Sequence, residues 1–439
     1  MSSTYLPHPN SGEPLGHETR RVVATQTVPP GGMDPSAFTL FVRPGRPGDL
    51  VTSGPSAPSP PRDRDSLLRC PACGTTYPLD ARVWRCRCGG ALDLDPPAGP
   101  LEPERIRQRT HDFWRYAEAL PPLGERVSLG ETMTPLVPWR HRRRQAWLKC
   151  DYLMPTGSYK DRGAAVLVSH LKGLGVQHAT DDSSGNAAAS LAAYAAGAGL
   201  RMTVFCPAAA SPGKLAQIRL YGAALRPIEG PRAGSTEALL AELARDPELF
   251  YASHLWHPLF IAGMKTLAYE ITEQRGWRVP DAVLCPVGAG SILLGLHGGF
   301  ADLVRMGLAQ HLPRLFAVQA AAVAPVARAW RAGAAEVAPI DAPQPTLADG
   351  IALPGPVRGE RILQALRESG GGVTTVSEDE IRAGLSRLGR QGFCVEPTSA
   401  VVVKGLEHLE DAGELGPDEE VVLVLSGFGL KAAAVLERL

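Results

Sequence analysis

The stretch "PTGSYKDRG", residues 155 to 163, places Lys160 where an irregular segment with a Gly-Ser pair becomes an apolar helix. Asp161 and Arg162 follow the lysine directly, and an acidic residue in the first turn favours the start of a helix. A lysine on a solvated surface needs no such setting, so the pattern indicates a lysine with a chemical role. The alternative at this point is a surface lysine in a loop that opens a helix.

Length and charge limit the class of protein. The chain has 439 residues, which is more than a single core of ordinary size, so we expect two or three domains. Its 45 basic and 45 acidic residues give a net charge of zero, and the one basic run, Arg140 to Arg144, is typical of a solvated loop or helix end. The charge therefore provides no footprint for nucleic acid or an anionic membrane.

The sequence shows no membrane-spanning or secretory pattern. No apolar run approaches about 18 residues, and the N-terminus lacks a charged segment followed by an apolar one. We therefore expect a soluble, cytoplasmic protein without a signal peptide. Residues 1 to 65 are rich in proline, serine and glycine and have few apolar side chains to bury, which predicts a disordered tail.

Four of the eight cysteines cluster in residues 66 to 95, as Cys70, Cys73, Cys86 and Cys88. Two pairs of thiolates at this spacing are typical of a zinc ribbon, in which a tetrahedral site of sulfur ligands closes a small module. Such a site leaves no open position, so we expect a structural zinc and not a catalytic one. Because a single residue separates the second pair, a degenerate ribbon without metal is the alternative.

From about residue 130 onward, after a predicted helical linker at 96–129, short β-rich runs alternate with Ala/Leu-rich helical runs. Buried parallel strands are predicted for "MTVFCP" (202–207), "AVLCPVG" (282–288), "LFAVQA" (315–320) and "VVLVLSG" (421–427). Strands and helices in alternation predict an α/β fold with a mostly parallel sheet.

Small residues follow one of these strands. Ligands in open parallel sheets bind at the carboxyl ends of strands, so the residues there are informative. Gly288, Ala289, Gly290 and Ser291 connect the strand to a helix, and small residues let backbone N–H groups approach an anion closely. A tight turn that needs small residues for packing is the alternative.

A second loop of this form opens the Ala-rich helical run that begins at Asn186. Ser183, Ser184 and Gly185 precede the asparagine, so hydroxyls, an amide and free helix N–H groups converge there. Such a loop suits a carboxylate or a phenolate oxygen. Since serine and asparagine are also favoured helix caps, a simple cap is the alternative.

Ser426 follows the last apolar strand, where its hydroxyl can make a neutral hydrogen bond or serve only as a turn residue. The lysine, the Ser-Gly-Asn loop, the glycine-rich loop and this serine occur in that order on an α/β frame. The combination resembles the fold type II pyridoxal-phosphate-dependent enzymes, the tryptophan synthase β-like group. Within the group it is most similar to the threonine synthase family, because "PTGSYKDRG" resembles that family's lysine motif and "LSGFGLK" its C-terminal signature.

The resemblance implies a two-domain catalytic region at 130–439, with a smaller subdomain at about 163–262 inserted in the larger one, and a homodimer. It implies that Lys160 binds pyridoxal phosphate covalently and then serves as the base for the Cα proton. Asn186 is implied to contact the phenolic oxygen of the ring, and Ser426 to face the pyridine nitrogen. The other implied roles are cofactor-phosphate binding by Gly288, Ala289, Gly290 and Ser291, and substrate-carboxylate binding by Ser183, Ser184 and Gly185.

The implied reaction converts O-phosphohomoserine to threonine and phosphate by elimination and water addition. A serine beside the pyridine nitrogen cannot protonate it as a carboxylic acid could, which favours elimination or replacement over transamination. The sequence departs from the family where the substrate phosphate binds, because Ala187 stands in place of a threonine and Phe260 in place of an arginine. Ser253 and His254 are the substrate-binding candidates there.

These departures leave two alternatives open, because a buried phosphate dianion needs charge-assisted hydrogen bonds. The first is a threonine or serine ammonia-lyase, or a β-replacement enzyme that acts on a modified serine. The second is a non-catalytic protein that binds pyridoxal phosphate, although the intact Lys160, Asn186 and Ser426 count against it. A small amino acid is the expected partner in either enzyme.

Overall fold

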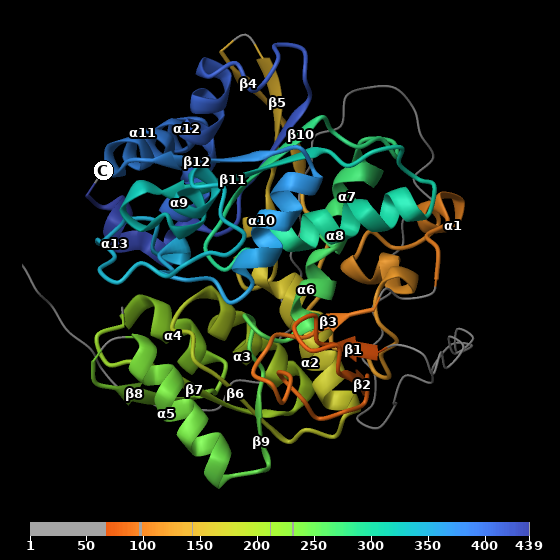
Figure 1. Ribbon diagram of the computed structural model, residues 1–439, viewed down its shortest axis with the longest axis vertical. Coiled ribbons are helices and arrows are strands. Elements are labelled where there is room, and N and C mark those ends of the chain that lie inside the picture. The colour runs from red at the N-terminus through yellow and green to blue at the C-terminus, as the bar shows by residue number, and fades with distance from the viewer. Residues whose placement is uncertain (1–66, 96–98, 143, 211, 231, 439) are drawn as a thin grey trace, which may run out of the picture. The chain divides into compact units, whose positions relative to one another are not determined.

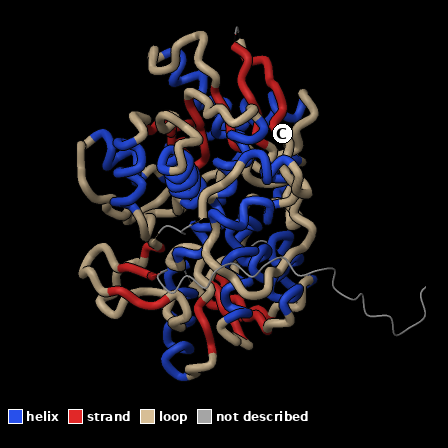
Figure 2. Tube along the Cα trace, turned by 90° about the vertical axis from the view of Figure 1, so that its right-hand side faces the viewer, coloured by secondary structure: helices blue, strands red, loops and turns tan. Residues whose placement is uncertain are grey.

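A computed structural model describes residues 67–95, 99–142, 144–210, 212–230 and 232–438. The predicted tail at residues 1 to 65 lies outside the described residues. The described residues form two larger sheets and one small sheet, with helices packed among them (Figure 1). In the turned view the strands gather in two main groups with helices between them (Figure 2). No helix in this part of the chain is long and apolar enough to cross a bilayer.

The regular elements have the following bounds. The strands are β1 (Leu67–Arg69), β2 (Thr76–Pro78), β3 (Asp93–Leu94), β4 (Leu136–His141), β5 (Arg144–Lys149), β6 (His178–Asp181), β7 (Arg201–Pro207), β8 (Ala224–Ile228), β9 (Leu249–Tyr251), β10 (Ala282–Pro286), β11 (Arg314–Ala320), β12 (Gly372–Val376) and β13 (Val421–Val424). The α-helices are α1 (Pro103–Arg107), α2 (Lys160–Gly173), α3 (Asn186–Ala198), α4 (Pro212–Leu220), α5 (Arg232–Arg245), α6 (Pro258–Met264), α7 (Thr266–Gln274), α8 (Ser291–Arg305), α9 (Pro325–Arg331), α10 (Gly359–Glu368), α11 (Glu378–Arg390), α12 (Pro397–Asp411) and α13 (Ala433–Leu436). Short 3-10 helices are η2 (Phe113–Ala119), η3 (Asp151–Leu153), η4 (Ala321–Val323), η5 (Asp349–Ile351) and η6 (Gly429–Ala432).

The larger sheet has the strand order β12-β11-β10-β13-β5-β4, and its neighbours are parallel except for the antiparallel pair β4 and β5. Every residue of β10 is buried. Its alternate residues serve two cores, because Val283 packs with the cluster that includes α8 while Leu284 packs with the cluster that includes α12. Burial on both faces explains why the strand reads as a continuous apolar run.

The second sheet has the order β8-β7-β6-β9, and all of its pairs are parallel. Its strands follow β5 and precede β10 in the sequence, and they fall within the predicted subdomain at about 163–262. The bounds of that subdomain stay a prediction. Parallel pairing in both sheets, with helices between successive strands, confirms the predicted α/β fold with mostly parallel sheets.

Residues 67–95, which we call the cysteine module, form a small antiparallel sheet of order β2-β1-β3. Leu68 at its centre lies opposite Tyr77 and Leu94 and is fully buried. The module carries the four clustered cysteines as free thiols. After it, the described part of the predicted helical linker, 99–129, contains α1 and the 3-10 helix η2.

A buried ionic network joins α2 to the larger sheet. The Arg162 guanidinium on α2 pairs with Asp151 at 2.7 Å and with Glu270 on α7 at 2.9 Å. Glu270 also accepts from Lys149, the last residue of β5, at 2.5 Å. Burial alone would raise the pKa of the Glu270 carboxyl, but Arg162 and Lys149 outweigh that effect and hold the pKa at about 2. The network therefore fixes the start of α2, and with it Lys160, against the larger sheet.

Candidate active site

A cavity of about 320 Å³ collects nearly all of the predicted site residues. A volume of this size falls in the range of small-molecule sites. Its lining includes Lys160, Ser183, Ser184, Gly185, Asn186, His254, Gly288, Ala289, Gly290, Ser291 and Ser426. Ser253 is the exception among the predicted residues, because it is fully buried behind the lining, where its hydroxyl accepts the N–H of Leu255.

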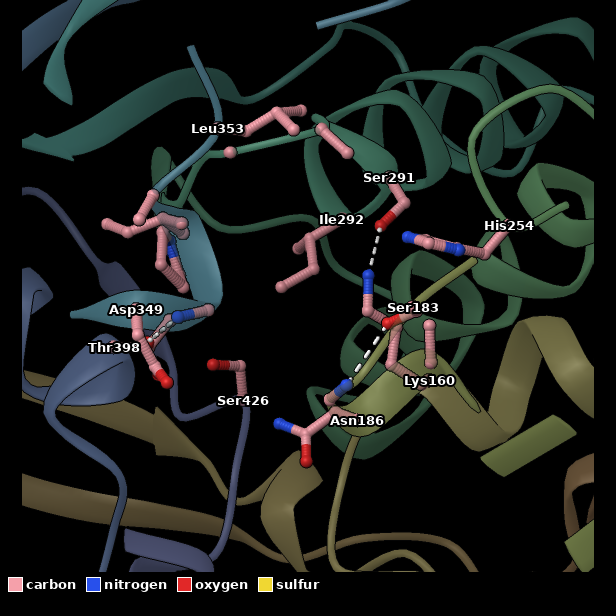
Figure 3. Close-up of a pocket in the computed structure, with 18 of the residues that line it drawn as sticks. Lys160, Ser183, Asn186, His254, Ser291, Ile292, Asp349, Leu353, Thr398 and Ser426 are labelled. Atoms are coloured by element: carbon pink, nitrogen blue, oxygen red, sulfur yellow. Dashed lines mark hydrogen bonds between the residues drawn. The ribbon is translucent and has the colours of Figure 1, made fainter. Parts of the chain in front are cut away.

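Lys160 begins α2 and points into the cavity (Figure 3). Its Nζ lies 3.4 Å from Ser291 Oγ at the start of α8. It also lies 4.6 Å from the ring centroid of Tyr159 and 5.8 Å from that of Phe260. The lysine is only 9% exposed. The surface-lysine alternative does not fit this arrangement, because the amine faces a partly enclosed cavity and an anion-type loop.

Asp161 holds the lysine loop in place. Its carboxylate accepts the backbone N–H of Thr156 at 2.7 Å and the Thr156 hydroxyl at 2.6 Å, both from the loop before the lysine. It also accepts the Ser190 hydroxyl of α3 at 2.5 Å. Burial raises the pKa of the Asp161 carboxyl to about 6, although these hydrogen bonds oppose the rise. Asp161 is therefore a structural link between the loop and α3.

The loop from Gly288 to Ser291 requires its small residues for packing. A Cβ atom at Gly288 would lie 2.8 Å from the Ile351 Cα, and one at Gly290 would lie 2.4 Å from the Ile362 side chain. Gly290 also has a φ of 82°, in the left-handed region that favours glycine. The close packing explains the glycines, and the same loop presents the N-terminus of the 15-residue α8 to the cavity. Helix N-terminal N–H groups bind phosphate, so the loop fits the phosphate of pyridoxal phosphate.

Asn186 and Ser426 lie near the opposite side of the cavity from Ser291 (Figure 3). Asn186 begins α3 and donates from Nδ2 to Glu396 Oε2 at 2.8 Å. The Ser426 Oγ lies 3.1 Å from Ser399 Oγ, and Ser399 also accepts the Ser426 backbone N–H at 2.9 Å. Both side chains are thus held by partners on α12 or directly before it, as preorganised ligand groups should be.

Several lining residues were not predicted from the sequence. They are Tyr159, Glu396, Thr398 and the segment 349–353. The Thr398 hydroxyl accepts the Gly350 N–H at 3.1 Å and so ties that segment to α12. Segment 349–353 contains only the short helix η5, so no periodic pattern could have pointed to it. Glu396 and Thr398 lie in "VEPTSAVVVKGL", which supported the family resemblance but carried no assigned role.

The substrate end of the cavity is marked by His254. Its Nδ1 lies 3.4 Å from Asp181 Oδ1, and the residue is 5% exposed. Phe260 is fully buried, and its ring centroid lies 6.0 Å from that of His254. Among the described lining residues the cationic side chains are those of Lys160 and His254, and no arginine is present.

Two other cations near this region do not line the cavity. Lys265 pairs with Asp302 at 3.1 Å and borders a different cavity. His257 caps α6 through Nδ1, which accepts the Leu259 N–H at 3.3 Å. Complete burial lowers the pKa of His257 well below its ordinary value, so this imidazole stays neutral.

The four thiols of the cysteine module fit a tetrahedral metal. Their Sγ atoms all lie within 4.8 Å of one another, and the Cys70–Cys88 and Cys73–Cys86 pairs are 3.5 Å apart. Sulfur ligands at about 2.3 Å from zinc are separated by about 3.8 Å in a tetrahedral site. The hydrogen bond with Tyr77 contributes most to lowering the pKa of Cys86, to about 6, which favours the thiolate that a metal needs.

Comparisons with known proteins agree with this geometry. Residues 127–427 match the family model described as "Pyridoxal-phosphate dependent enzyme". The chain is therefore a member of the pyridoxal-phosphate-dependent enzyme family of fold type II.

Its sequence relatives in that family are threonine synthases. That of Methanocaldococcus jannaschii is 35% identical over 378 residues, which cover 83% of this chain and 93% of the relative. That of Methanosarcina acetivorans is 33% identical over 374 residues, covering 83% and 92%. A solved threonine deaminase from the organism abbreviated T.th. is 29% identical with a TM-score of 0.58, covering 67% of this chain and 92% of that one.

Proposed function

We propose that the chain is a pyridoxal-phosphate-dependent carbon–oxygen lyase of the threonine synthase type, which converts O-phosphohomoserine to threonine and phosphate. The observation that carries the proposal is the approach of Lys160 Nζ to Ser291 Oγ, 3.4 Å, at the head of the glycine-rich loop. The identity of the chain to threonine synthases over most of its length supports the choice of reaction.

The residues of the cavity would hold the cofactor as follows. Gly288, Ala289, Gly290 and Ser291 would bind its phosphate at the start of α8. Asn186 would contact the phenolic oxygen, and Ser426 would face the pyridine nitrogen. When bound, pyridoxal phosphate withdraws electrons from the Cα atom of an attached amino acid and so makes its proton removable.

Lys160 would be both the attachment point and the base. Its amine would be released when the substrate amine takes its place, and would then remove the Cα proton from a distance set by the start of α2. Ser183, Ser184 and Gly185 would bind the substrate carboxylate. The neutral hydroxyl of Ser426 offers no proton to the pyridine nitrogen comparable to that of a carboxylic acid, which favours elimination.

The overall reaction balances as O-phosphohomoserine plus water giving threonine plus phosphate. The C–O bond at Cγ breaks and phosphate leaves with the electron pair, and water later supplies the hydroxyl group at Cβ and a proton. His254 is the residue that we assign to the leaving phosphate, because it is the one cationic lining side chain besides Lys160 in the described residues. Asp181 at 3.4 Å would favour the protonated imidazole that an anion needs.

A second candidate function follows from the charges of the same wall. Asp349 and Glu396 line the cavity, Phe260 is buried beside it, and no lining arginine is present among the described residues. Such a wall suits an uncharged leaving group, as in a threonine or serine ammonia-lyase or a β-replacement enzyme. The similarity to a threonine deaminase supports this candidate, although less strongly than the threonine synthase relatives support the first.

One panel of substrates separates the candidates. Purified protein with pyridoxal phosphate is incubated with O-phosphohomoserine, threonine, serine or O-phosphoserine, and released phosphate, ammonia and 2-oxo acid are measured. We expect phosphate and threonine in equal amounts from O-phosphohomoserine. Ammonia and 2-oxobutanoate from threonine, without turnover of O-phosphohomoserine, would establish the ammonia-lyase instead. No product and no spectral change with any amino acid would leave a non-catalytic cofactor-binding protein.

The proposal includes a structural zinc in the cysteine module and a cytoplasmic homodimer. The zinc is supported by the spacing of the four Sγ atoms. The homodimer and the location stay predictions from the family resemblance and the sequence. Light scattering coupled to size-exclusion chromatography measures the first, and fractionation of the cells that make the protein measures the second.

A further inference from the structure

The cysteine module contacts the loop that carries His254. This loop, residues 252–257, joins β9 to α6. The Trp84 ring packs edge-on against Tyr251, with centroids 4.9 Å apart, and against Trp256, with centroids 5.8 Å apart. Tyr251 directly precedes the loop and Trp256 is its penultimate residue, so a single side chain of the module contacts both ends of the loop.

Arg358, the residue before α10, ties the same two parts together. Its Nη2 donates to the backbone carbonyls of Leu92 and Trp256, at 2.7 Å each, and its Nη1 donates to Asp93 at 2.9 Å. Leu92 and Asp93 belong to the cysteine module, whereas Trp256 belongs to the loop. Because charged donors make the stronger hydrogen bonds, this buried guanidinium fixes the module against the loop.

The loop has no helix or strand of its own between these contacts. Its backbone is held at the start by the Ala252 N–H, which donates to Thr180 at 2.8 Å, and at the end by the His257 N–H, which donates to Ser253 at 3.0 Å. His254 lies between them with its side chain in the cavity. The position of His254 therefore depends on what packs against the outside of the loop, and that is the Trp84 ring.

We infer that Trp84 is a positioning residue, which holds the His254 loop against the cavity and so couples the cysteine module to substrate affinity. The effect on affinity rests on the proposed function, whereas the coupling of module and loop follows from the contacts themselves. Trp84 does not line the cavity, so it acts through the loop and not on Lys160. Since Cys86 follows Trp84 by two positions, whatever orders the four thiols also orders the ring.

The test compares Trp84→Ala, Trp84→Phe and the control Arg82→Ala in the full-length holoenzyme. Arg82 is exposed and its side chain reaches only the Glu248 carbonyl, at 3.5 Å. In Trp84→Ala we expect amide hydrogen exchange in residues 252–257 to accelerate by about tenfold. We also expect KM for the amino-acid substrate to rise by about fivefold while kcat changes by less than about twofold. Trp84→Phe should recover most of both effects, and Arg82→Ala should change neither.

Two results would overturn the inference. Unchanged exchange in residues 252–257 would show that the ring does not hold the loop, and a fall in kcat at constant KM would show that it does not act on affinity. Trp84→Leu, which keeps apolar bulk but lacks the ring, gives the same readings if Trp84→Ala fails to fold. If the enzyme acts on none of the amino acids, the exchange measurement still decides the coupling, so the two failures are distinguishable.

Discussion

Asn186 Nδ2 donates a hydrogen bond of 2.8 Å to Glu396 Oε2 and so joins the first residue of α3 to the residue before α12. The two residues are 210 positions apart in the sequence, and both line the cavity. Glu396 is 4% exposed. The bond holds the Asn186 amide at the wall where we propose that the phenolic oxygen of the cofactor binds.

Removing the carboxylate should therefore weaken the site. In Glu396→Ala the loss of one charge-assisted hydrogen bond, about 1.5–3 kcal/mol, should lower kcat/KM by roughly ten- to a hundredfold. Glu396→Gln keeps an acceptor oxygen at the same position and serves as the matched control, with a loss of about fivefold. Steady-state kinetics on the holoenzyme measures both, and equal activity in the alanine variant and the wild type would contradict the role given to the bond.

The buried network of Glu270 should make stability depend on pH. The pKa of Glu270 lies near 2 in the folded protein, below the ordinary value of 4.5. Its stabilising effect is therefore fully present above about pH 4.5 and is lost as the pH falls toward 2. In Glu270→Gln we expect unfolding free energy to fall by about 3–5 kcal/mol at neutral pH, because Arg162 and Lys149 lose their shared partner.

The control for that variant is Glu125→Gln. Glu125 pairs with Lys172 at 2.6 Å but its side chain is 68% exposed, so its loss should cost at most about 1 kcal/mol. Urea unfolding at several pH values measures all three proteins. A Glu270→Gln variant as stable as the control, or one with an unchanged pH dependence below about pH 4.5, would count against the network.

The sequence predicted the site well where function lies at the junctions of strands and helices. Lys160 and Ser291 are 131 positions apart, yet both follow loops that open a helix, and the parallel α/β frame brings such loops together. Ser253 was assigned to the substrate from its place in the motif, but burial of its side chain depends on which way the loop turns. Partners such as Glu270 for Arg162 could not be named, because 108 positions separate them and no periodic pattern links them.

His254 should control the affinity for a phosphorylated substrate. In His254→Gln we expect KM for O-phosphohomoserine to rise by about tenfold, because one charge-assisted contact is lost. The rate of threonine turnover, if any, should change less, since threonine carries no phosphate. His297→Gln is the matched control, because His297 faces Glu368 at 2.9 Å and borders the other cavity. An equal KM in the two variants would remove His254 from the phosphate site.

The cysteine module should bind about one zinc per chain. Removing the metal with a chelator, or replacing Cys88 by Ser, should lower the midpoint of thermal unfolding while the absorbance of the bound cofactor persists. Cys394→Ala, outside the cluster, is the control for loss of a thiol. Elemental analysis of protein purified without chelator gives the stoichiometry. Well-folded protein that contains no zinc would favour the degenerate ribbon.

The most direct test of the proposed chemistry is to identify the lysine that binds the cofactor. The holoenzyme is treated with borohydride, which makes the bond between lysine and pyridoxal phosphate permanent, and the labelled peptide is then identified by mass spectrometry. We predict a single labelled site at Lys160, and no label in Lys160→Ala, which can still hold the cofactor through the glycine-rich loop. A label on any other lysine, or a wild-type holoenzyme without label, would contradict the assignment of Lys160 and of the reaction derived from it.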